Sequence, residues 1–298
     1  MTVATAVAQS LDGVIVVDLT RYLPGPYCTR LLADLGAHVI KIEPPQGDPM
    51  RGVAWPGTYD LLNAGKEIVT LDLRDPSARD RLHELLGRAT VCVEGFRPAT
   101  ARDIGVDGAT LAARYPNLVH CSISGYGQAG RAADRAAHDL NYQADAGLLG
   151  LVSPGEMPSL LIADITAAYR ATIAILAALV ARRGATIDVA LVDAARSWVP
   201  LAPPPVLRGE FACYNVYETS DDRWIALGAL EPKFWERFCR GVGHPEWVPQ
   251  QFSAGEVRTA LLDDVRSLIR SRSQAEWIAA LTSLDCCVSA IAGAELQH

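Results

Sequence analysis

The sequence lacks the cysteine spacing that disulfide frameworks and zinc sites require. Its seven cysteines are an odd number without a CxxC pair, and the only two close together are adjacent. This set suits neither a disulfide-stabilised secreted domain nor a zinc knuckle, so we expect no metal site and small buried cysteines. No basic segment followed by an apolar stretch and a cleavage site opens the chain. We therefore expect no secretion signal and a cytoplasmic location.

An excess of positive charge is also missing. The 27 Lys and Arg residues face 34 Asp and Glu residues, which gives a net charge of −7 at pH 7. Because phosphate polymers and anionic bilayers repel such a chain, we expect a small-molecule partner, with no nucleic acid and no membrane. The most apolar stretch, 160–181, carries Asp164 and Arg170, which predicts a buried helix rather than a membrane span.

Short β-branched segments alternate with helical spacing over the first 200 residues. The strand-like segments are 14–18, 38–43, 67–73, 90–95 and 117–124, and the helical ones are 27–35, 77–86, 108–114 and 164–183. This alternation indicates a largely parallel sheet with helices on both faces. The sequence therefore predicts an α/β fold, with a large doubly wound, Rossmann-like domain at 1–197. Asp164 is expected at the N-cap of the longest helix, which Gly184 would end.

A proline cluster separates this domain from the rest of the chain. WVPLAPPPVLRG (198–209) holds four prolines within six residues, which predicts a stiff linker over 198–214. Beyond it, a hairpin over 215–230 and helices near 232–240, 256–270 and 274–281 predict a second, smaller α+β domain at 215–298.

The segment GYGQAG (125–130) matches the G-x-G-x-x-G fingerprint of dinucleotide-binding folds. It comes after five predicted strands, and no apolar helix follows it. Without that helix a pyrophosphate would find neither aligned amides nor a helix dipole. We therefore expect an ordinary glycine loop near a ligand, with a nicotinamide oxidoreductase as the minor alternative.

Three titratable residues are candidates for chemistry, although each has a simpler explanation. His138 precedes a helical stretch that Asp139 could cap, and a lone loop histidine usually faces solvent. Asp164 at a helix start is ordinarily a cap, and Glu231 before Pro232 begins another helix. Capping and catalysis are compatible, because the amides and dipole that hold a carboxylate also stabilise a nearby oxyanion.

Seven motifs follow one another over nearly the whole chain. They are DLTRYLPGPYCTRLLADLGAHVIKIEPPQGDPMR (18–51), NAGKEIVTLDLRDP (63–76), VCVEGFRPAT (91–100), ISGYGQAG (123–130), HDLNY (138–142), LIADITAAYRATIAILAAL (161–179) and YETSDDRWIALGALEPKFW (217–235). This order resembles the CaiB/BaiF superfamily, the family III CoA-transferases. HDLNY and ALEPKFW resemble in particular the α-methylacyl-CoA racemases of that superfamily.

The resemblance implies an enzyme with one of two chemistries. In racemases, the residues matching His138 and Asp164 exchange a proton at the α-carbon of a 2-methylacyl-CoA or related thioester. The residue matching Glu231 reaches that site from the small domain. In CoA-transferases, the residue matching Asp164 is a nucleophile that carries the acyl group. The motifs favour the racemase, and a non-catalytic acyl-CoA-binding protein is a third alternative.

The resemblance also implies that particular residues contact CoA. It implies an interlocked homodimer, and it implies no cofactor beyond the CoA moiety of the substrate. The matching residues are Leu71, Asp72, Leu73, Arg74, Ala89, Thr90, Val91, Arg97, Ala137, Asp139, Leu140, Asn141 and Tyr142. Arg97 would pair with a phosphate, which suits its permanently charged guanidinium. Residues 137–142 would line the acyl pocket.

The chain departs from the racemase pattern at several places. Ile165 and Thr166 follow Asp164 where racemases have glycines. Their side chains predict either a narrower acyl pocket or a chain from the transferase-like branch of the superfamily. Ala137 stands in place of the glycine before the histidine. The chain also stops ten residues after DCCV (285–288), and we expect the family's C-terminal return segment to be absent.

Overall fold

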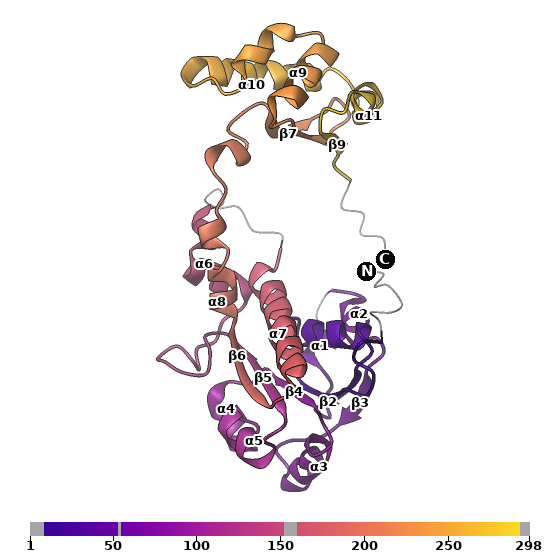
Figure 1. Cartoon of the computed structure of the whole chain (residues 1–298), viewed down its shortest axis with the longest axis vertical. Helices are drawn as coiled ribbons and strands as arrows, with labels where there is room; N and C mark the ends of the chain where they lie inside the picture. The colour runs from indigo at the N-terminus through magenta and orange to yellow at the C-terminus, as the bar shows by residue number, and fades with distance from the viewer. Residues whose placement is uncertain (1–8, 53–54, 152–159, 293–298) are drawn as a thin grey trace. The chain divides into compact units, whose positions relative to one another are not determined.

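A computed structural model of the chain describes residues 9–52, 55–151 and 160–292. The chain divides into two compact units, Met1–Leu201 and Ala202–His298, and each is described by itself (Figure 1). The division falls inside the proline-rich segment that the sequence predicts as a linker.

The first unit is built on a six-stranded parallel sheet in the order β3-β2-β1-β4-β5-β6. Its strands are β1 (Ile15–Leu19), β2 (His38–Glu43), β3 (Glu67–Thr70), β4 (Val91–Glu94), β5 (Val119–Ser124) and β6 (Ala185–Ala190). The strand order reverses between β1 and β4. Ligands of doubly wound sheets bind at such a switch point, beyond the carboxyl ends of the strands.

Helices cover both faces of this sheet, because successive residues of a strand point to opposite faces and each face of the sheet carries buried apolar side chains. Val16 of β1 faces a core with α1 (Pro24–Asp34), α6 (Asp139–Ala146), α7 (Ile162–Ala181) and α8 (Leu191–Arg196). Val17 faces the core that holds α3 (Pro76–Leu86), α4 (Pro98–Ile104) and α5 (Gly108–Arg114). The short α2 (Thr58–Asn63) packs beside α1. The predicted mixed α/β architecture with a parallel sheet is confirmed.

The second unit has an antiparallel sheet in the order β7-β8-β9, with strands Tyr214–Glu218, Trp224–Gly228 and Val288–Ala290. Its helices are α9 (Pro232–Gly241), α10 (Gly255–Ile269) and α11 (Gln274–Leu281). They bury a core that includes Trp235, Phe238 and Trp277. The hairpin and three helices lie where the sequence predicts them, and β9 adds an unpredicted third strand.

The prediction that Asp164 caps α7 is wrong. The N-cap is Leu161, and Asp164 is the third residue of the helix. Its backbone N–H donates instead to the Asp139 carboxylate at 3.0 Å, so α7 receives its capping acceptor from another helix. At the other end, Arg182 takes the left-handed backbone, with φ 52°, that was expected of Gly184. Gly184 is needed for close packing instead, since a Cβ there would lie 2.0 Å from the Pro116 carbonyl oxygen.

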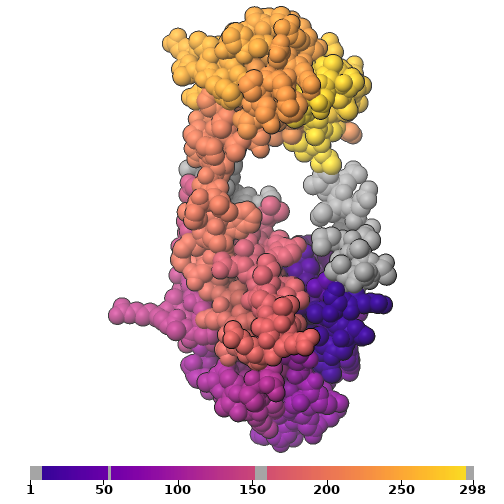
Figure 2. Space-filling view, in the orientation of Figure 1, coloured from indigo at the N-terminus to yellow at the C-terminus, as the bar shows by residue number. Residues whose placement is uncertain are grey.

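Among the described helices, α7 is long and apolar enough to cross a membrane by length and composition. It contacts α1, β5 and β6, and 39% of its most apolar window is buried. The sequence predicts a buried helix here, and the structure shows one face of α7 packed on the first unit while Ile173 and Val180 are exposed. Figure 2 shows the outer side of α7 at the surface of the first unit.

Candidate active site

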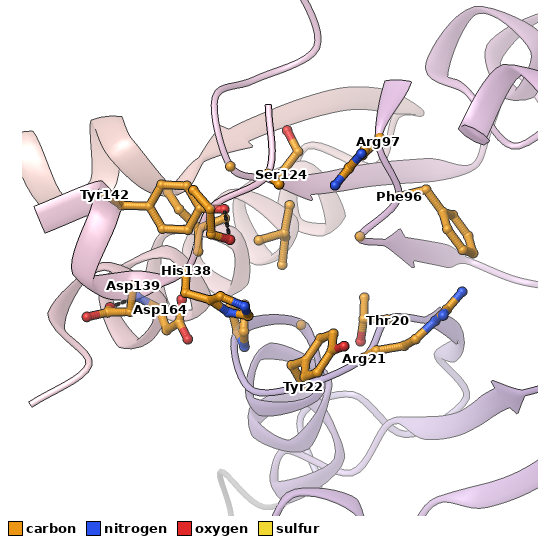
Figure 3. A pocket seen from close by; sticks show the side chains of 18 of the residues that line it. Thr20, Arg21, Tyr22, Phe96, Arg97, Ser124, His138, Asp139, Tyr142 and Asp164 are labelled. Carbon is orange, nitrogen blue, oxygen red and sulfur yellow. Dashed lines mark hydrogen bonds between the residues drawn. The ribbon is translucent and has the colours of Figure 1, made fainter. Parts of the chain in front are cut away.

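A cavity of about 490 Å³ opens beyond the carboxyl ends of β1, β4 and β5, which is the switch point of the sheet. We call it the active-site pocket (Figure 3). Its lining comes from the segments after these strands and from the starts of α6 and α7: Thr20, Arg21, Tyr22, Pro24, Gly25, Gly95, Phe96, Arg97, Ile123, Ser124, Gly125, Ala133, Arg135, Ala136, Ala137, His138, Asp139, Asn141, Tyr142, Asp164 and Leu191.

The pocket brings His138 and Asp164 together, and Asp139 connects the helix ends that carry them. His138 is the N-cap of α6, and its backbone N–H donates to the Asn141 side-chain oxygen at 3.1 Å. Asp139, predicted as the cap, is the first helical residue and is buried. One of its carboxylate oxygens accepts the Asp164 N–H at 3.0 Å, and the other accepts Nε2 of Gln143 at 2.5 Å. Both candidate residues are therefore fixed at the ends of packed helices.

The surroundings of Asp164 change its acidity. Burial disfavours the charged carboxylate, and the negative charge of Asp139 adds to that effect, so the pKa of Asp164 is raised to about 7. A carboxyl group that is half ionised at neutral pH can both accept and return a proton. A carboxyl group with this raised pKa in a pocket is a candidate for acid–base chemistry.

Replacing Asp139 by Asn should lower the pKa of Asp164 from about 7, because the amide removes the neighbouring charge but keeps an oxygen that can accept the Asp164 N–H. The measurement is a titration of the Asp164 carboxyl carbon by NMR. Asp80→Asn, on the exposed side of α3, is the matched control and should not move the midpoint. An unchanged midpoint in Asp139→Asn would mean that burial alone sets the acidity.

The GYGQAG loop is a packing element of the pocket. Gly125 lies against Tyr142, where a Cβ would come within 2.6 Å of the phenol oxygen, and that hydroxyl donates to the Ala137 carbonyl at 3.0 Å. In this fully described stretch no helix begins between Gly130 and the start of α6 at Asp139. The dinucleotide fingerprint therefore lacks the helix that would hold a pyrophosphate.

A second cavity of about 520 Å³ adjoins the first, because Arg21 and Phe96 line both. The predicted CoA residues Leu71, Asp72, Leu73 and Arg74 all line this second cavity, while Arg97 lines the active-site pocket. Among the residues that the structure describes, neither Arg21 nor Arg97 forms an ion pair, so both guanidinium groups are available to an anion.

Other predicted contacts lie elsewhere. Ala89, Thr90 and Val91 are at the amino-terminal end of β4, away from the carboxyl ends that form both cavities. Leu140 is exposed on α6 and does not line the pocket. Glu231 is the N-cap of α9 in the second unit.

The sequence reasoning missed Arg21, Tyr22 and Arg135 as pocket residues. For Arg21 and Tyr22 a signal existed, since they directly follow the carboxyl end of β1 in a doubly wound sheet. No comparable signal marks Arg135, which lies in an irregular segment between β5 and α6.

Known proteins are similar to this chain in sequence and in fold. The family model described as CoA-transferase family III matches residues 11–296. The alpha-methylacyl-CoA racemase of Homo sapiens is 29% identical over 95% of this chain and 78% of its own length. The succinyl-CoA–D-citramalate CoA-transferase of Chloroflexus aurantiacus is 31% identical over 86% of this chain and 72% of its own. The crystal structure of Rv3272 from Mycobacterium tuberculosis superposes with a TM-score of 0.83 at 28% identity, covering 97% of this chain and 84% of that one.

Proposed function

Because this chain belongs to CoA-transferase family III, we propose that it racemises the α-carbon of a 2-methylacyl-CoA or a related acyl thioester. The observation that carries the proposal is that two proton-carrying groups, His138 and Asp164, line one pocket, with Asp139 of α6 accepting the backbone N–H of Asp164. Acyl transfer through an aspartate requires the carboxylate alone. A second titratable group beside it favours proton exchange.

In the proposed reaction the Asp164 carboxylate takes the α-proton, and the electron pair of the broken C–H bond moves to the thioester oxygen as an enolate. The imidazolium of His138 then returns a proton to the other face of the carbon, and the enolate collapses to the thioester. The opposite epimer reacts with the two roles exchanged. Each direction needs one of the two groups deprotonated and the other protonated, and a carboxyl with a pKa of about 7 can take either form near neutrality.

The adjoining cavities support an acyl-CoA as the substrate. We propose that the thioester lies in the active-site pocket and that CoA extends past Phe96 into the second cavity. Arg21 and Arg97 stand along this path without carboxylate partners in the described parts of the chain, and a guanidinium pairs well with phosphate oxygens.

The experiment is incubation of the protein with one epimer of a 2-methylacyl-CoA in deuterated water. We expect loss of the α-proton signal by NMR together with appearance of the other epimer. CoA binding without exchange across a panel of branched acyl-CoAs would reject the proposal.

A second candidate is CoA transfer through an acyl-aspartate at Asp164. Ile165 and Thr166 favour it, because they add side chains directly after the aspartate, and so does the similarity to a CoA-transferase at 31% identity. Hydroxylamine should then trap Asp164 as a hydroxamate in the presence of acyl-CoA, and mass spectrometry of the peptide would detect it.

A further inference from the structure

Tyr22 has an unusual backbone for its residue type. Its φ is 64°, in the left-handed region that residues with a side chain rarely adopt unless their surroundings hold them there. Four other described residues without glycine's freedom share this feature, namely Arg182, Asp222, Asp285 and Cys287. Of these five, Tyr22 is the one that lines the active-site pocket.

Buried contacts hold the chain just before Tyr22. The Asp18 carboxylate accepts both the backbone N–H of Thr20, at 2.9 Å, and its hydroxyl, at 2.5 Å. The buried ammonium of Lys41 donates to the Thr20 carbonyl at 2.8 Å. Gly25, three residues after Tyr22, packs so tightly that a Cβ would lie 2.2 Å from Thr20. The loop therefore has little freedom to relax.

The left-handed backbone of Tyr22 adds little buried apolar surface to the core, because 48% of the residue is exposed. Its ring instead meets the imidazole of His138 edge to face, with ring centroids 6.4 Å apart and planes at 89° (Figure 3). His138 is itself exposed, and its side chain forms no hydrogen bond to another described side chain. The Tyr22 ring is thus the aromatic surface against which this imidazole rests.

We propose that Tyr22 is a positioning residue for His138. The strained loop holds the tyrosine ring against the imidazole and restricts it to the orientation that serves the pocket. Without the ring, an exposed histidine samples its other side-chain rotamers. The inference rests on the proposed function only in assigning His138 a role in proton transfer.

Three substitutions of Tyr22 distinguish the effect of its ring from the effect of its backbone conformation. Tyr22→Ala removes the ring and should lower kcat for α-proton exchange about tenfold to a hundredfold, with a smaller change in KM, because misplacing a reacting group is costly. Tyr22→Phe should restore most of that loss, since the ring contact needs no hydroxyl. Tyr22→Gly also relieves the backbone, so its Tm should rise by about 2–4 °C while kcat stays low.

Arg182→Gly is the matched control. Arg182 has the same left-handed backbone at the end of α7, away from the pocket, so its Tm should rise with kcat unchanged. A Tyr22→Ala or Tyr22→Gly variant that keeps the wild-type kcat would overturn the inference. So would recovery of kcat in Tyr22→Gly but not in Tyr22→Ala, which would show that kcat depends on the left-handed backbone and not on the ring.

An NMR measurement that needs no turnover tests the contact between Tyr22 and His138 independently of the proposed function. The ring-proton signals of His138, identified by their absence in His138→Gln, should carry a ring-current shift from Tyr22 that persists in Tyr22→Phe and disappears in Tyr22→Ala. If this shift behaves as expected but the wild type exchanges no proton, the proposed function fails and the positioning contact stands. If Tyr22→Ala leaves the His138 signals unmoved, the positioning inference fails.

Discussion

Replacing Asp164 by Asn should reduce α-proton exchange by about a hundredfold to ten-thousandfold, the range expected for loss of an acid–base group. The amide has the same shape as the carboxyl and cannot take a proton from carbon. The measurement is the rate of deuterium incorporation into a 2-methylacyl-CoA. Asp193→Asn, which alters an exposed aspartate on α8, is the control and should exchange at the wild-type rate.

The same Asp164→Asn variant should be more stable than the wild type at neutral pH. The pKa of Asp164 is raised from 3.8 to about 7 by burial and by Asp139, so the folded state binds a proton that the unfolded state has already released. The stability due to this group is complete below pH 4 and is lost as the pH rises through 7. The advantage of the variant should therefore grow from pH 4 to pH 7 and stay constant above.

Urea unfolding of both proteins at several pH values tests this second effect. A variant that loses exchange and gains stability has lost a group kept for chemistry at a cost in folding. A variant that loses exchange and is also less stable at pH 7 would show instead that the carboxylate is a structural group. Wild-type exchange in Asp164→Asn would exclude Asp164 from the proton transfer.

The sequence predicted the sheet because its signal is local. Strands such as HVIKIE (38–43) carry apolar residues on both faces, which is the pattern of a sheet covered by helices. The position of Asp164 within α7 could not be predicted in the same way. The backbone N–H of Asp164 donates to the carboxylate of Asp139, 25 residues earlier, and no local sequence pattern predicts that contact.

The residues of the candidate site also differ in whether a local sequence pattern identifies them. His138 and Asp164 belong to motifs, so sequence alone could name them, and the pocket brings them together. The place of Tyr22 after β1 could be read from the sequence, but its role could not, because Asp18 and Lys41 hold the preceding Thr20 and the Tyr22 ring contacts His138. Residues that act through such long-range contacts leave no periodicity in the sequence.

Replacing Lys66 by Met should strongly destabilise the first unit. The Lys66 ammonium is fully buried and lies 3.1 Å from Asp18, and it also donates to Thr29, Asn63 and the Pro26 carbonyl. Methionine fills similar space but leaves the buried Asp18 carboxylate without its nearest cation. Removing one partner of a buried pair costs about 3–5 kcal/mol, which urea unfolding would detect.

The acidity of Asp18 gives this loss a pH dependence. Burial alone would raise the pKa of Asp18, but Lys66, Lys41 and the hydroxyls of Thr20 and Thr29 overcome it and lower the pKa to about 2. This stability is present above the unfolded value near 4 and is lost as the pH falls through 2. Burial also lowers the pKa of Lys66, so its own desolvation offsets part of the attraction. The deficit of Lys66→Met should therefore be greatest near neutrality and shrink toward pH 2.

Two further variants decide whether charge is the cause. Asp18→Asn combined with Lys66→Met removes both charges and should recover part of the lost stability, because no unpaired ion remains buried. Arg81→Met breaks an exposed pair with Glu84 on α3 and should change stability little. If the double variant is no better than Lys66→Met, the loss comes from packing and hydrogen bonds. In that case the charge of the Asp18–Lys66 pair is not what holds the loop that carries Tyr22 in place.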